Sequence, residues 1–181
     1  MSISPAGIKR TVGAVLDCLA DENVEVREMA SKALSGIVRS SQRQSVIPLK
    51  NRFITLAKQT DLPSRQDPGY ADALRKLHSA ILGLCALIQS APYTVEPWMP
   101  PLTDVLASHT TDPPPISTTI RKTAGDFKKT HQDTWHTDQK AFDEDQLQNL
   151  STMLVGTSYC KSSELAGMVP TLTVNRQPVD A

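Results

Sequence analysis

Apolar residues recur at helical spacing along most of the first 155 residues. In the segment 24–39, for example, Val26, Ala30, Ala33 and Ile37 fall on one helical face, a spacing typical of amphipathic helices that bury one side. The same criterion predicts helices at about 8–19, 24–39, 45–58, 70–89, 98–109, 116–131 and 143–155. The helix at 70–89 is the most apolar, so we expect it to be the best-buried element.

The segments between these helices are rich in proline, aspartate and serine. Residues 60–69 have the composition of an exposed loop, and residues 111–115 end with three prolines. Residues 92–97 begin and end with proline, which restricts itself and the residue before it, so this stretch should be extended. At the last helix, Asp143 can cap the first turn.

A short pattern occurs twice. Val26-Arg27-x-x-Ala30 matches Ile120-Arg121-x-x-Ala124, and each copy follows an acidic turn that contains Asp21 or Asp112. Paired helices with this pattern in the second member resemble HEAT repeats, and strand signals are nearly absent. We therefore predict an all-α fold: a HEAT/armadillo-like α-solenoid fragment built from antiparallel helix pairs.

The pattern divides the chain into two parts. Residues 1–155 form one helical domain, and residues 156–181, which contain Pro170 and Pro178 without helical periodicity, are expected to be a disordered C-terminal extension. The first helix begins almost at Met1 without an obvious cap. Because terminal repeats usually have a polar outer face, the chain is expected to be the terminal piece of a longer array.

Charge and cysteine content narrow the class of protein. The 19 basic side chains balance the 19 acidic ones, and the pI is about 6.9, which argues against a nucleic-acid or membrane-surface protein. No apolar run approaches the length of a membrane span. Cys18 and Cys85 fall within apolar helical patterns and should be buried free thiols, as in a reducing compartment. We expect a soluble intracellular protein.

One polar cluster could be drawn as a catalytic or metal site. His131, Asp133 and His136 lie close together in sequence, but no third ligand follows at a recognisable spacing. The alternative is a polar turn between helices, anchored by Trp135. Phosphate-binding glycine loops, nucleophile elbows and paired-cysteine zinc motifs are absent from the sequence. We therefore predict no enzymatic activity, no cofactor and no metal site.

Other exposed features also have two interpretations. Trp98, Pro100, Pro101 and Leu102 could form a binding ridge, or a helix start that is packed on the core by its tryptophan. The pairs Arg75-Lys76, Arg121-Lys122 and Lys128-Lys129 lack interleaved aromatics, so solvation and pairing with acids explain them.

Five blocks of sequence together resemble one family. They are Val26-Arg27-Glu28-Met29-Ala30 with Leu34-Ser35-Gly36, His78-x-x-x-Leu82-Gly83-Leu84, Pro92-Tyr93-x-Val95-x-Pro97-Trp98-Met99-Pro100, Thr130-His131-Gln132-Asp133-x-Trp135, and Asp145-Gln146-Leu147 through Leu154-Val155. Over residues 24–159 the chain resembles the C-terminal region of the large HEAT-repeat proteasome activators, the proteasome activator complex subunit 4 family. The resemblance implies an ATP-independent activator of the nucleus and cytoplasm that caps the α-subunits of the proteasome core particle.

The resemblance also implies a docking site at the end of the last helix. In that family the chain ends with a hydrophobic residue, a tyrosine and a final residue whose carboxylate pairs with a lysine between two α-subunits. Here Tyr159, Cys160 and Lys161 occupy those positions, and twenty further residues follow. Cysteine lacks the phenol, and Lys161 carries no free carboxylate. We therefore expect a non-catalytic module whose gate-opening motif is disrupted.

Two alternative functions stay open. The family has been proposed to read acetyl-lysine through an Asn-Phe pair, and the corresponding positions here are Ser41 and Gln42. The chain could accordingly be an acetyl-lysine or histone-binding module, with acetylated histones as partners. It could also be a general helical scaffold whose groove binds another protein.

Overall fold

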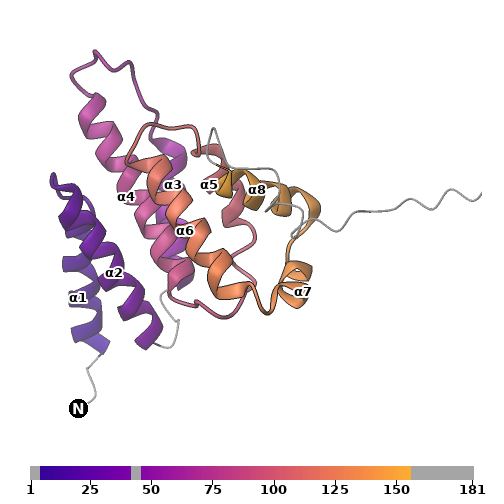
Figure 1. The fold of residues 1–181 in the computed structure, drawn as a ribbon. Helices are drawn as coiled ribbons and strands as arrows, with labels where there is room; N and C mark the ends of the chain where they lie inside the picture. The colour runs from indigo at the N-terminus through magenta and orange to yellow at the C-terminus, as the bar shows by residue number, and fades with distance from the viewer. Residues whose placement is uncertain (1–4, 42–45, 156–181) are drawn as a thin grey trace, which may run out of the picture.

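The computed structural model describes residues 5–41 and 46–155, and every regular element in these ranges is a helix (Figure 1). In chain order they are α1 (Pro5–Leu19), α2 (Val24–Ser40), α3 (Val46–Gln59), α4 (Tyr70–Gln89), α5 (Leu102–Ser108), α6 (Ile116–His131), α7 (Trp135–Asp138), the 3-10 helix η1 (Gln139–Ala141) and α8 (Glu144–Leu154). The prediction of an all-α helical-repeat fold is confirmed.

Three helices, α2, α4 and α6, lie side by side and run parallel (Figure 1). Four hydrogen bonds join α2 to α4 and its C-cap, from Arg27 to His78, from Ser31 to the Leu82 carbonyl, and from Arg39 to the carbonyls of Gln89 and Ser90. Each links a residue to one 50 or 51 positions later. A nearly constant offset requires parallel helices, so α2 and α4 occupy equivalent places in successive helix pairs.

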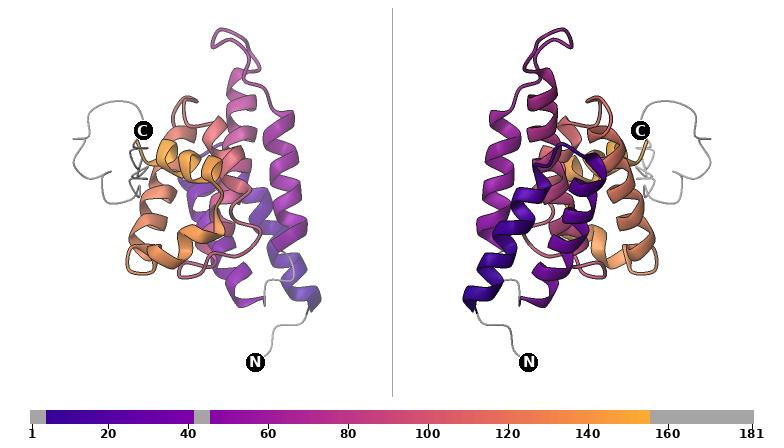
Figure 2. Two further views of the ribbon diagram at one scale, coloured as in Figure 1. Left: turned by 90° about the vertical axis from the view of Figure 1, so that its right-hand side faces the viewer. Right: turned by 90° about the vertical axis from the view of Figure 1, so that its left-hand side faces the viewer.

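The centre of this layer is α4, which contacts α2, α3 and α6. Every residue of α4 from 77 to 87 is buried, because the helix is covered on more than one side. Its side chains form the middle of the core together with Leu34, Phe53, Leu106 and Ile120. The prediction that this would be the best-buried helix is confirmed. Figure 2 shows α3 and α4 rising together to the loop at 60–69, whose tip is exposed.

The buried face of α2 is not the one that the apolar spacing predicted. Val26 and Ala33 are exposed and Ile37 is half-buried. The buried residues are instead Arg27, Ala30, Ser31, Leu34, Ser35 and Val38. Arg27 and Ser31 face α4 and hydrogen-bond to it. Because the apolar spacing ignores these polar side chains, it predicted a different face of α2 from the one that is buried.

Helix α5 begins later in the sequence than predicted, because prolines precede it. The predicted helix at 98–109 begins only at Leu102, because Pro97, Pro100 and Pro101 each lack an N–H and disfavour helical conformation in the preceding residue. Trp98 is partly buried against the core and Met99 is 3% exposed, which confirms the packing interpretation of this segment. The stretch at 92–97 was predicted to be extended throughout, but Pro92 and Tyr93 form a turn.

The predicted polar turn after α6 is present at residues 132–134, but the short helices α7 and η1, which were not predicted, follow it. Two further expectations are corrected by tertiary position. Cys85 is buried as predicted, but Cys18 is exposed, since α1 is covered on one side alone. Arg121 is exposed whereas Arg27 is 5% exposed, so the two copies of the sequence pattern do not place their arginines in equivalent environments.

Candidate functional site

The predicted docking residues Tyr159, Cys160 and Lys161 lie outside the described residues. The structure does show the helix that precedes them. Asp143 caps α8 by accepting a hydrogen bond from the Gln146 backbone at 2.8 Å, and the Gln146 side chain accepts one from the Asp143 backbone at 3.0 Å. This reciprocal capping box, together with the acids of the first turn, stabilises the helix start and confirms the predicted cap.

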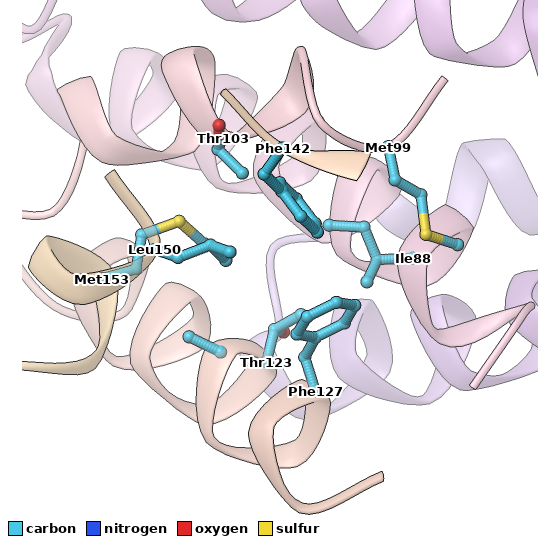
Figure 3. Close-up of a pocket in the computed structure, with 9 residues that line it drawn as sticks. Ile88, Met99, Thr103, Thr123, Phe127, Phe142, Leu150 and Met153 are labelled. Atoms are coloured by element: carbon cyan, nitrogen blue, oxygen red, sulfur yellow. The ribbon is translucent and has the colours of Figure 1, made fainter. Parts of the chain in front are cut away.

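Side chains that line an apolar pocket pack α8 against α5 and α6. Figure 3 shows side chains from four parts of the chain converging on this pocket: Ile88 of α4, Met99 and Thr103 at α5, Thr123 and Phe127 of α6, and Phe142, Leu150 and Met153 at α8. Phe142 stands edge-on to Phe127 with ring centroids 6.2 Å apart, a favourable aromatic geometry. This packing fixes the position of α8, and therefore the point at which the chain leaves the end of this helix.

The polar cluster of His131, Asp133 and His136 is not assembled as a site. His131 is 1% exposed and stacks on Phe127 at 4.0 Å, whereas Asp133 and His136 are exposed. Within the described residues, no three His, Cys, Asp or Glu side chains gather closely enough to hold a metal ion. The Trp135 ring lies 6.2 Å from that of Phe142, consistent with the anchoring interpretation.

A buried polar chain crosses the helical layer. Arg27 Nε donates to His78 Nδ1 at 3.1 Å, and His78 Nε2 lies 3.0 Å from Thr119 Oγ1. Since Nδ1 accepts, the ring proton resides on Nε2 and is donated to Thr119. Arg27 Nη1 also donates to the carbonyls of Asp21 and Glu22, at 2.7 and 3.1 Å. These contacts tie α2, α4 and α6 together.

Burial sets the protonation states of this layer. It lowers the pKa of His78 to about 4, with a smaller contribution from the Arg27 charge, so the imidazole is neutral at physiological pH. Burial also lowers the pKa of Arg27 and raises the pKa of the Cys85 thiol to about 12. Cys85 is therefore no nucleophile. The polar chain has the properties of a structural element and lacks those of a catalytic one.

Sequence reasoning assigned no role to Thr119 and named His78 only as part of a family-like block. The usable signal was the repeated arginine pattern, which pointed to Arg27 but also to the exposed Arg121. At the acetyl-lysine positions, the Ser41 hydroxyl donates to the Val38 carbonyl at 3.2 Å, and Gln42 lies outside the described residues. No helix in the described part of the chain has the length and apolarity needed to cross a bilayer.

Parallel helices stacked at a nearly constant offset define a helical-repeat protein. Residues 74–161 match the family model described as proteasome activator complex subunit 4-like, C-terminal. The chain is 39% identical over 153 residues to proteasome activator complex subunit 4 of Bos taurus, covering 80% of this chain and 8% of the relative. It therefore belongs, over this region, to the proteasome activator complex subunit 4 family.

More distant relatives agree. Proteasome activator subunit 4 of Arabidopsis thaliana is 32% identical over 142 residues, covering 78% of this chain and 8% of the relative. Proteasome activator BLM10 of Saccharomyces cerevisiae is 29% identical over 142 residues, covering 77% of this chain and 7% of the relative. The chain thus spans less than a tenth of the length of these curated relatives.

Proposed function

We propose that this chain is a non-catalytic C-terminal module of an ATP-independent proteasome activator, and that it binds the α-subunits at the end of the proteasome core particle. The family match over residues 74–161 carries the proposal, because the relatives are named as proteasome activators and the matched region is their C-terminal part. That match begins at residue 74, within α4, and extends through α8 and the three predicted docking positions. On the same basis we propose a nuclear and cytoplasmic location.

We further propose that the gate-opening motif is disrupted in this chain. The family mechanism requires a tyrosine followed by a terminal carboxylate, whereas Cys160 offers no phenol and Lys161 continues into further residues. A carboxylate that exists only at a chain end cannot be replaced by an internal peptide bond. Binding to the core particle then depends on the helical surface, and stimulation of peptide hydrolysis is weak or absent.

The test compares the chain with a repaired variant. The repaired chain ends at position 161 and carries Cys160→Tyr and Lys161→Ala, and a matched control has the same truncation without the substitutions. Co-sedimentation with purified core particle and hydrolysis of a fluorogenic peptide are measured for all three. We expect gate opening from the repaired chain only, with tighter binding.

Two outcomes would contradict the proposal. Strong peptidase stimulation by the unmodified chain would show that its docking motif is functional. Failure of the repaired chain to bind core particle any better than its truncated control would refute docking through these positions.

A further inference from the structure

A groove of about 390 Å³ opens between α2, α4 and α6. Helix α4 contacts both α2 and α6, and buried residues of α4 line the groove, so α4 forms its floor. Leu82 and Cys85 form that floor, and Pro114 and Pro115 form part of the wall at the start of α6. Its volume is in the range of protein pockets that bind ligands.

Hydrogen bonds between the lining residues hold the helices of the groove together. The Ser31 hydroxyl of α2 donates to the Leu82 carbonyl of α4 at 3.0 Å. Thr119, which also lines the groove, is bonded to the buried ring of His78. The groove is therefore preformed, and a ligand would not have to order it on binding.

The two outer helices place a lysine on each side of this apolar floor. Lys32 projects from α2 and Lys122 from α6, and both line the groove. Both side chains are exposed, and neither has an ion-pair partner among the residues that the structure describes. Glu28, one turn before Lys32, is the one carboxylate among the described residues that line the groove.

We propose that this groove binds an extended peptide segment that has a carboxylate side chain near each end and apolar side chains between them. Helix axes pack about 8–10 Å apart, so the axes of α2 and α6, on either side of α4, are at most about 16–20 Å apart. An extended chain rises about 3.3 Å per residue, so a segment of up to five or six residues spans this distance. The carboxylates pair with Lys32 and Lys122, and the apolar residues pack on Pro114 and Pro115, which are not buried.

Because of Glu28, the proposal predicts a gain in peptide affinity at one position and a loss at another. Its carboxylate opposes an acidic peptide at the α2 side of the groove, so removing that charge strengthens binding. Reversing the charge of Lys122 weakens binding because it replaces an attractive pair by a repulsive one. If Glu28 and Lys122 had only a structural role, changing them would not affect peptide binding in opposite directions.

The test uses two fluorescein-labelled hexapeptides, one with glutamate at both ends and four apolar residues between them, the other with glutamine at both ends. Binding to the full chain is measured by fluorescence anisotropy at low and physiological salt. We expect about tenfold weaker binding for the glutamine peptide and for Lys122→Glu and Lys32→Glu, and a several-fold gain for Glu28→Gln. Lys58→Glu on α3 makes the same change in net charge outside the groove.

Several results would overturn the proposal. They are equal affinity for the two peptides, absence of binding by either, or equal losses for Lys58→Glu and Lys122→Glu. Circular dichroism of each variant confirms that the helices are retained. Core-particle binding is not part of this readout, so failure here is distinguishable from failure of the proposed activator function.

Discussion

Arg27 is a buried charge, and each hydrogen bond of its side chain within the described residues goes to a neutral acceptor. Its guanidinium reaches the carbonyls of Asp21 and Glu22 and the ring of His78. A buried ion is tolerated only when its donors are satisfied, because desolvation is otherwise costly. This one side chain therefore fixes both the turn between α1 and α2 and the register of α2 against α4.

Replacing Arg27 by alanine should destabilise the protein. The substitution leaves three acceptors without their donor and removes buried packing, so we expect a loss of about 2–4 kcal/mol in the free energy of unfolding. Arg121→Ala, in the matching sequence pattern but exposed, should change it by less than about 0.5 kcal/mol. Urea denaturation followed by circular dichroism measures both, and similar losses would contradict this role for Arg27.

His78 should make stability depend on pH. Its pKa is lowered from 6.5 to about 4 by burial and by Arg27, so the unfolded chain binds a proton more readily between these values. Stability is thus fully present above pH 6.5 and is lost as the pH falls towards 4, by up to about 3 kcal/mol. In His78→Gln, which keeps both hydrogen-bond roles without titrating, this component should disappear. An unchanged pH profile would argue against it.

At the scale of elements, α4 is covered by neighbouring helices on several sides, and at Gly83 a side chain of α3 approaches it closely. A Cβ placed on Gly83 would lie 2.5 Å from Cδ1 and from Cζ of Phe53 on α3, far inside van der Waals contact. Phe53 is itself 3% exposed and cannot move aside freely. The absence of a side chain at Gly83 lets the ring of Phe53 seat against α4.

Gly83→Ala should therefore destabilise the α3–α4 pair by about 1–3 kcal/mol through overpacking, despite the better helix propensity of alanine. Gly36→Ala is the control, because nothing lies within 4 Å of a Cβ at that position. It should stabilise the chain by about 0.5–1 kcal/mol. Thermal unfolding distinguishes the two, and a double variant with Phe53→Leu should recover part of the loss at Gly83.

At the scale of the whole molecule, the helices form a layered stack with a middle and ends. In Figure 2 α1 stands at the outer side of the stack, and Leu19 is the one fully buried side chain among its described residues. In α4, by contrast, residues 77–87 are all buried. In stacked repeats each unit depends on its neighbours, so stability should decrease from the middle to the edge.

Native-state hydrogen exchange tests this gradient. Amides of residues 77–87 should exchange only through global unfolding, and those of α1 should exchange faster, through local opening. In mild urea, hydrogen exchange of residues 77–87 should accelerate with the m-value of global unfolding, and exchange of α1 should accelerate much less. Equal protection of α1 and α4 would show instead that the described region unfolds as one cooperative unit.

The sequence by itself determined α1 to α6 and α8, because helical periodicity, proline restrictions and a cap such as Asp143 act between residues a few positions apart. It predicted α4 as the best-buried helix because that segment is the most apolar. The short helices α7 and η1 were not predicted. Only the tertiary structure decided which face of α2 is buried, since Arg27 and His78 are 51 positions apart. Nearly identical local patterns around Arg27 and Arg121 have opposite exposure, because burial depends on the neighbouring helix.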